Sequence, residues 1–335
     1  KELESKIHNI KILDPACGTG EFLIRAIDVL LKISKAIQNH KEKSGKYSHV
    51  GKKKKSESVT YATFDKEIES KELRTIIQNN IFGVDINEEA IEITELNMFL
   101  RLATSSERLL DLSKNIRVGN SIISDKSIHP KAFDWKAFLK KFDVIIGNPP
   151  FNAEISDDES KFILENYPAT KNNSNTAIAF LNLSKNLLRS DGFLGLVIPK
   201  SFMYSQKWLA ARNFAFNDIT KIMDVSKAFV GVLLEQIIII LKNDSNAKYY
   251  EINFLSGKTA NKVDKKLIKL FGVILNDLSK DELLLGQKII SENDFCSKIA
   301  DITRGEIIQK YLKKSSDIPI LRGKSIGRYK IKPIT

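Results

Sequence analysis

Residues 12–23 read Ile-Leu-Asp-Pro-Ala-Cys-Gly-Thr-Gly-Glu-Phe-Leu, and this stretch decides the fold. A short apolar strand runs into a glycine-containing turn, and an amphipathic helix follows. Gly18 and Gly20 can adopt positive φ, which lets a ligand lie against the loop and the helix N-terminus. The pattern is therefore typical of a Rossmann-like sheet. A dinucleotide site is less favoured, because Leu23 occupies the place of the third glycine in the G-x-G-x-x-G fingerprint.

A second strand is predicted at residues 81–86, which read Ile-Phe-Gly-Val-Asp-Ile. A helix from Glu88 to about Arg101 follows, and its apolar face is predicted to hold Ala90, Ile93, Leu96 and Leu100. Asp85 lies at the end of this strand, where a carboxylate can accept hydrogen bonds from ribose hydroxyls. The alternative is that Asp85 only caps the helix. The preceding glycine loop favours the ribose role.

The apolar run at residues 142–147 is followed by Asn148-Pro149-Pro150-Phe151. Both prolines fix φ and lack a backbone N–H, so the strand ends in a rigid turn whose carbonyl groups are predicted to be free acceptors. An amide oxygen, free carbonyls and an aromatic face then converge, which suits a planar base held by its exocyclic amine. Taken alone, the tetrapeptide also fits an ordinary turn. The two upstream motifs favour the binding role.

In this order, the three motifs resemble those of gamma-class DNA methyltransferases, which act on the N6 amine of adenine. That class includes the modification subunits of restriction–modification systems and fused restriction–methylation enzymes. The resemblance covers about residues 10–241. It implies an α/β, Rossmann-like fold with a mostly parallel sheet, S-adenosylmethionine as cofactor and double-stranded DNA as partner. The implied reaction is methylation of a flipped-out adenine within a defence system.

The resemblance also implies which residues bind the cofactor. These are Asp14, Ala16, Cys17, Gly18, Gly20, Asp85, Ile86 and Asn120. Asp14 and the loop at 16–20 would face the methionine part, and Asp85 would hold the ribose. Asn120 stands where the family often has aspartate. Its amide oxygen can still accept a hydrogen bond from the adenine amine.

The implied catalytic residues are Asn148, Pro149, Pro150 and Phe151. The Asn148 side-chain oxygen and the Pro149 carbonyl would accept hydrogen bonds from the target amine and aim its lone pair at the methyl group, so that catalysis depends on positioning. The base must first leave the duplex. Phe151 would stack on one face of the base and Phe229 on the other. A core position is the alternative for Phe229.

Composition agrees with a nucleic-acid partner. Lysine and arginine number 53 and aspartate and glutamate 41, a formal net charge of +12. Such a surface favours polyanions but does not choose between DNA and RNA. The longest apolar stretch, residues 229–241, is too short to span a bilayer, and two cysteines give no disulfide framework. We expect a prokaryotic cytoplasmic protein held to the nucleoid by DNA binding, without a metal site, since the histidines are scattered.

The predicted domains are a methyltransferase domain at 1–242 with a lysine-rich insertion at about 41–57, a helical connector at 243–298, and the beginning of a truncated target-recognition domain at 299–335. The insertion is predicted to be a solvated loop. Predicted DNA contacts are Lys200, Arg304 and Arg322. The family usually continues further at both ends. We therefore expect a fragment, with any nuclease domain or subunit outside this chain.

Two alternative functions compete with this prediction. A methyltransferase acting on a release-factor glutamine or on an RNA guanine amine also uses an Asn-Pro-Pro-aromatic motif. The region after residue 242 and the Arg304-Gly305 pair favour DNA adenine. A catalytically idle DNA-recognition module is the second alternative. The intact glycine loop, Asp85 and the tetrapeptide at 148–151 argue against it.

Overall fold

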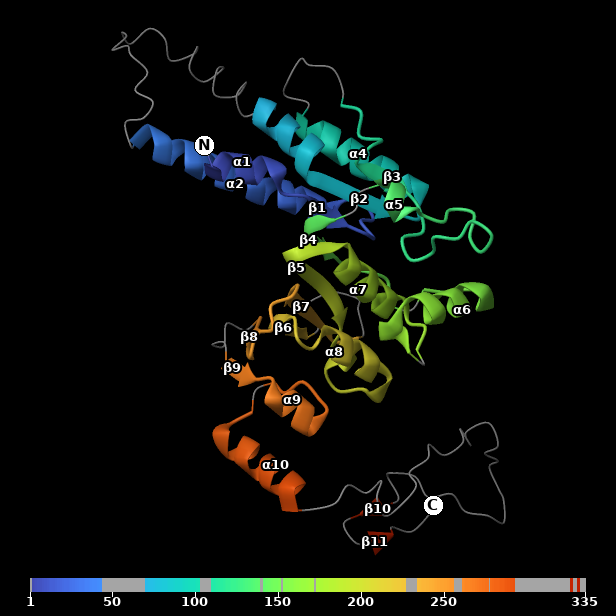
Figure 1. Ribbon diagram of the computed structural model, residues 1–335, viewed down its shortest axis with the longest axis vertical. Helices are drawn as coiled ribbons and strands as arrows, with labels where there is room; N and C mark the ends of the chain where they lie inside the picture. Colours follow the sequence, from blue (N-terminus) through green and yellow to red (C-terminus); the bar gives the residue numbers. More distant parts are fainter. Residues whose placement is uncertain are drawn as a thin grey trace. The chain divides into compact units, whose positions relative to one another are not determined.

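Figure 1 shows the computed structural model of the chain. It describes residues 2–43, 70–102, 110–138, 141–151, 153–171, 173–226, 234–255, 261–276, 278–292, 326–327 and 330–331. The chain divides into two compact units, Lys1–Leu283 and Leu284–Thr335. In the second unit, β10 (Ile326–Gly327) and β11 (Lys330–Ile331) form an antiparallel pair. The rest of the predicted target-recognition region, and residues 44–57 of the predicted insertion, lie outside the described residues.

The first unit is built on a nine-stranded sheet with the order β3-β2-β1-β4-β5-β7-β6-β8-β9. Its strands are β1 (Ile12–Asp14), β2 (Ile81–Asp85), β3 (Ile116–Val118), β4 (Phe142–Gly147), β5 (Leu188–Pro199), β6 (Ile219–Ser226), β7 (Gln236–Lys242), β8 (Tyr249–Phe254) and β9 (Asn261–Asp264). Strands β1 to β5 are parallel, and β7 runs antiparallel between β5 and β6. The predicted α/β fold with a mostly parallel sheet is confirmed. Strand order reverses beside β1, where such sheets bind ligands.

Helices cover both faces of this sheet. The described α-helices of the first unit are α1 (Glu2–Asn9), α2 (Glu21–Lys43), a helix over residues 70–80, α4 (Glu88–Leu102), α5 (Trp135–Phe138), α6 (Asp157–Asn166), α7 (Thr176–Leu187), α8 (Leu209–Ala215) and α9 (Lys266–Phe271). Helix α10 (Lys280–Glu292) begins in the first unit and ends in the second. Consecutive residues of a strand point to opposite faces. Ile12 accordingly belongs to one buried cluster with α2 and α4, and Leu13 to another with α7 and α8.

Helix α4 packs through a different face from the one predicted. Its buried residues are Ile91, Thr94, Met98 and Leu102. Ile93, Leu96 and Leu100 are exposed, so the predicted apolar face was wrong. The rotation of the helix is fixed by the Thr94 hydroxyl, which donates a hydrogen bond to the Gly18 carbonyl at 2.8 Å. Ile91, Met98 and Leu102 also recur at helical spacing, so the hydrophobic periodicity of this helix allows more than one buried face.

Residues 243–298 are not the purely helical connector that was predicted. Strand β8 pairs parallel with β6, and β9 pairs antiparallel with β8, so both extend the main sheet. Buried and exposed side chains alternate along β8 as they do in a strand, since Tyr250 and Ile252 are buried while Tyr249 is exposed. The helical prediction holds only for the part that contains α9 and α10.

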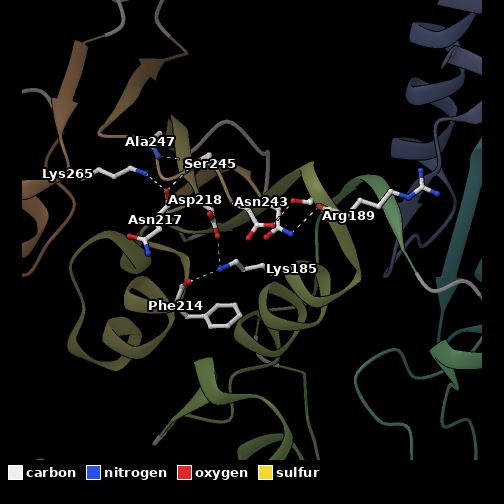
Figure 2. A network of polar contacts seen from close by, with 11 residues as sticks. Lys185, Arg189, Phe214, Asn217, Asp218, Asn243, Ser245, Ala247 and Lys265 are labelled. Atoms are coloured by element: carbon white, nitrogen blue, oxygen red, sulfur yellow. Dashed lines mark hydrogen bonds and ion pairs between the residues drawn. The ribbon is translucent and has the colours of Figure 1, made fainter. Parts of the chain in front are cut away.

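A polar network joins α7, the α8–β6 turn and the β7–β8 turn at the amino end of β6 (Figure 2). The Lys185 ammonium lies 2.6 Å from the Asp218 carboxylate and donates to the Phe214 carbonyl. Lys265 Nζ and Ser245 Oγ both donate to the Asn217 carbonyl. Burial lowers the pKa of Lys265 to about 8, although the Asp218 charge opposes this shift. These contacts stabilise the sheet at the amino end of β6.

Candidate functional site

A cavity of about 470 Å³ lies at the carboxyl ends of the parallel strands. Ala16, Asp85, Asn120 and Asn148 line it together, although they follow four different strands. This convergence is expected, because the carboxyl ends of parallel strands meet at one edge of a sheet. The cavity therefore joins the predicted cofactor residues to the Asn-Pro-Pro turn.

The loop after β1 adopts the conformation that its glycines predict. Gly18 and Gly20 have φ angles of +52° and +86°. A Cβ atom on Gly20 would lie 2.8 Å from Thr94, so the loop and α4 approach too closely for any side chain there. The Gly18 amide donates to Asp85 Oδ2 at 2.8 Å. The glycine loop is thereby tied to the end of β2.

Asp85 is a cavity residue and not the cap of the following helix. Its Oδ1 accepts from the Asn87 amide at 2.9 Å, and its Oδ2 accepts from Gly18. The cap of α4 is Asn87, whose side-chain oxygen accepts from the Glu89 amide at 2.9 Å. Each carboxylate oxygen of Asp85 keeps a second lone pair for a ligand. The geometry therefore fits the predicted ribose contact better than the capping alternative.

Asp14 lies behind the cavity wall at the end of β1. It is only 1% exposed, and its Oδ1 accepts from the Ala16 amide at 3.0 Å. Burial raises the pKa of this carboxyl to about 7, against the effect of the Ala16 amide and together with the Asp85 charge. Asp14 thus supports the loop and carries a proton that can be lost near neutral pH.

Not every predicted cofactor residue faces the cavity. Ala16, Asp85, Ile86 and Asn120 line it, whereas Asp14, Cys17, Gly18 and Gly20 do not. The Cys17 side chain belongs to the core beside α2, and burial raises the pKa of its thiol. The tight turn directs Cys17 Sγ toward Gly83 and away from the cavity, and the cofactor contact of the loop at 16–20 stays a prediction.

The loop after β3 is fixed to the loop after β1. Ser121 Oγ donates to the Pro15 carbonyl at 2.6 Å, and Trp135 Nε1 donates to the Ser121 carbonyl at 2.8 Å. Asn120 is 8% exposed, and its Nδ2 lies 3.4 Å from Glu159 Oε1. Asn120 thus lines the cavity beside a carboxylate, and its contact with the cofactor stays a prediction.

The Asn-Pro-Pro turn presents Asn148 to the cavity and buries Pro149. The Pro150 carbonyl accepts from Thr176 Oγ1 at 2.6 Å, so the prediction that both prolyl carbonyls are free was wrong for Pro150. Within the described part of the chain, the Pro149 carbonyl accepts no hydrogen bond. Phe151 is half-buried against the core and does not line the cavity. Its stacking role stays a prediction.

The predicted DNA contacts and the second stacking residue are placed only in part. Lys200 Nζ lies 2.9 Å from the Asp224 carboxylate and 3.3 Å from that of Glu235. Two carboxylates thus neutralise Lys200, which opposes its predicted contact with phosphate. Phe229, Arg304 and Arg322 lie outside the described residues.

Sequence reasoning missed several residues that line the cavity: Ser121, His129, Glu154, Glu159, Thr176 and Phe180. The two glutamates follow shortly after the Asn-Pro-Pro-Phe motif, and this proximity was the available signal. Thr176 and Phe180 come from α7. Their approach to the cavity depends on how α7 packs against β5, which no local pattern encodes.

The cavity is acidic. Asp85, Glu154 and Glu159 contribute carboxylates, and none of the described residues that line it is a lysine or an arginine. These carboxylates favour a ligand that is neutral or positively charged. Among the described residues, no group of three or more histidines, cysteines, aspartates or glutamates could hold a metal ion. In the same part of the chain, no helix is long and apolar enough to cross a membrane.

Residues 79–230 match the family model of the Eco57I restriction-modification methylase. The type II methyltransferase M.VspI of Vibrio sp. (strain 343) is 27% identical over 257 residues, which cover 76% of this chain and 48% of that protein. The type II restriction enzyme and methyltransferase RM.Eco57I of Escherichia coli is 27% identical over 234 residues, covering 62% and 22%. The chain thus spans less than half the length of these relatives.

Solved structures show the same fold at low sequence identity. The type IIL restriction-modification enzyme MmeI in complex with DNA superposes with a TM-score of 0.53 at 15% identity, over 78% of this chain and 35% of that one. A nuclease-deletion mutant of the type ISP restriction-modification enzyme LlaGI, bound to a DNA substrate mimic, gives 0.51 at 16% identity, over 77% and 22%. The sheet described above is thus shared with these restriction-modification enzymes.

Proposed function

We propose that this chain, which carries a methylase domain of the Eco57I restriction-modification family, transfers a methyl group from S-adenosylmethionine to the N6 amine of an adenine in double-stranded DNA. One observation carries the proposal. A single cavity is lined both by Asp85 and Asn120, the predicted cofactor residues, and by Asn148 of the Asn-Pro-Pro turn. Donor and acceptor of the methyl group can therefore meet in one enclosed space.

The chemistry of the wall fits this cofactor. S-adenosylmethionine supplies a methyl group on a positively charged sulfonium when it is bound. Carboxylates of Asp85, Glu154 and Glu159 favour such a cation and oppose the pyrophosphate of a dinucleotide. In this assignment Asp85 accepts hydrogen bonds from the ribose, and Ile86 forms an apolar wall for the adenine ring.

The catalytic contribution of the chain is positioning. Asn148 Oδ1 and the Pro149 carbonyl accept hydrogen bonds from the target amine and orient its lone pair. The Thr176 hydroxyl fixes the turn by donating to the Pro150 carbonyl at 2.6 Å. Because this hydrogen bond holds the turn before the substrate arrives, little reorganisation of the turn is needed during the reaction.

Access of the target base requires its extrusion from the duplex, at about a few kcal/mol. Phe151 and Phe229 remain the proposed stacking residues, and Phe180 adds an aromatic side chain to the cavity wall. We assign contacts with the DNA backbone to Arg304, to Arg322 and to the basic surface in general. A nuclease domain or subunit outside this chain would complete a restriction–modification system in the prokaryotic cytoplasm.

The test is incubation with mixed-sequence DNA and cofactor labelled on the methyl group, followed by mapping of the modified base. Parallel reactions with ribosomal RNA and with a release factor examine the other amine and amide substrates. Label on adenine N6 in DNA supports the proposal, and label only on RNA or on protein refutes it. Binding of S-adenosylmethionine without transfer to any substrate would identify an idle recognition module instead.

Replacement of Asn148 tests the catalytic assignment. The Asn148→Ala variant should lose methyl transfer by about a hundredfold or more, the scale seen when one preorganised polar group is removed. Cofactor affinity should change little. Asn9→Ala, at an exposed position on α1, is the matched control and should keep full activity. Near-normal activity of Asn148→Ala would remove the basis for this assignment.

A further inference from the structure

The Asn120 amide does not point its oxygen freely into the cavity. Asn120 Oδ1 faces the Ile122 amide at 3.3 Å, and Nδ2 faces Glu159 Oε1 at 3.4 Å. These two neighbours fix the orientation of the amide, because one is a donor and the other an acceptor. The Asn120 oxygen predicted to accept from an adenine amine thus already accepts from the backbone, and unlike a carboxylate it carries no charge.

Glu159 brings a carboxylate to the same corner. It lies in the first turn of α6, where its Oε2 accepts from the Ser156 amide at 2.8 Å and the Ser156 hydroxyl accepts from the Glu159 amide at 3.2 Å. This capping box uses only one carboxylate oxygen. The other oxygen lies against Asn120, and the side chain lines the cavity. Glu159 is therefore held by its capping box, and its Oε1 keeps a further lone pair for a ligand besides the contact with Asn120.

We propose that Glu159 accepts a hydrogen bond from the exocyclic amine of the cofactor's adenine, and that Asn120 positions its carboxylate. This inference rests on the proposed function. It moves the acceptor from the loop after β3, where the sequence pattern suggests it, to the helix after the Asn-Pro-Pro turn. The charge that Asn120 lacks is supplied by a residue 39 positions later in the chain.

Adenine presents a donor at this corner, whereas hypoxanthine presents a carbonyl oxygen that a carboxylate repels. The experiment therefore titrates the full chain with S-adenosylhomocysteine and with its hypoxanthine counterpart by calorimetry. A hydrogen bond to a charged acceptor corresponds to about a tenfold to hundredfold change in affinity. The wild-type chain should prefer the adenine ligand by about this factor.

Glu159→Gln should bring the two affinities within about threefold of each other, because an amide can either accept or donate. Glutamine also supports a capping box, so the melting temperature should change little. Glu154→Gln is the matched control, since it removes another carboxylate of the same wall. This control should leave the ratio of the two affinities as in the wild type.

Two failures are distinguishable. If the wild-type chain binds S-adenosylhomocysteine and Glu159→Gln keeps the wild-type ratio, the role of Glu159 is refuted while the proposed function stands. A role of Glu159 in capping alone gives this result. If the wild-type chain binds neither ligand, the proposed function fails, and the inference fails with it.

Discussion

Gly147 is the position at which a single added methyl group should disturb the site most directly. It ends β4 and immediately precedes Asn148. A Cβ atom at Gly147 would lie 2.7 Å from Asp14 Oδ1 and 3.3 Å from Asp14 Cγ. Asp14 cannot move away freely, because it is 1% exposed and accepts a hydrogen bond from the Ala16 amide. The Gly147→Ala variant must therefore displace the end of β4 or the loop after β1.

The magnitude follows from these distances. Ordinary contact begins at 3.4 Å, so the atoms must separate by roughly 0.7 Å, an overpacking that destabilises a core by about 1–3 kcal/mol. In a domain of this size, each kcal/mol lowers the melting temperature by about 2–4 °C. A misplacement approaching 1 Å near reacting groups reduces the rate by up to about a hundredfold. The rate of methyl transfer should thus fall by a larger factor than the fraction of folded protein at the assay temperature.

Gly195→Ala is the matched control, on the neighbouring strand β5. A Cβ atom there would lie 3.8 Å from Ile146 Cγ2, which is ordinary contact. Both variants also reduce backbone freedom in the unfolded chain to the same extent. The assay is transfer of labelled methyl groups to DNA, together with thermal unfolding of each variant. Equal activity of the two variants would refute the argument that the Asp14–Gly147 contact holds Asn148 in place.

Two further predictions concern Asp14 and Thr176. The pKa of Asp14 is raised from 3.8 to about 7, so its contribution to stability is present at acidic pH and is lost as the pH rises through about 7. Denaturant unfolding between pH 4 and 8 should show a smaller decline in the free energy of unfolding for Asp14→Asn than for the wild type. Identical slopes of this free energy against pH would contradict the raised pKa. Thr176→Val removes the hydroxyl that donates to the Pro150 carbonyl, which should destabilise the fold by about 1 kcal/mol. It should also lower methyl transfer at saturating cofactor, whereas an unchanged rate would show that the turn holds without this bond.

Local patterns predicted the elements that build the site. Positive φ at Gly18 and Gly20 follows from the steric freedom of glycine, and the short strands beside them follow from apolar runs that end in turn residues. Asp85, Asn120 and Asn148 then meet at one edge because parallel strands align their carboxyl ends. To predict that these residues converge, only the fold class and the positions of three strand ends were needed.

Contacts between distant segments account for the features that were not predicted. The rotation of α4 depends on the bond from Thr94 to Gly18, 76 residues away, and the carboxylate beside Asn120 comes from a separate helix. The direction of β7 is another example, because an apolar run has the same composition whether its strand is parallel or antiparallel. β8 alternates as a strand does, but its sequence does not show that β6 is its partner in the sheet.

The contrast between the basic chain and its acidic cavity bears directly on the proposed reaction. A formal net charge of +12 attracts a polyanion from a distance, yet the described residues of the cavity wall include carboxylates and neither lysine nor arginine. Phosphate groups are therefore repelled from the cavity while an uncharged base can enter it. The same carboxylates favour a methyl donor that is positively charged, and this preference is lost once the charge has gone. One electrostatic arrangement thus separates base from backbone and distinguishes the methyl donor from its product.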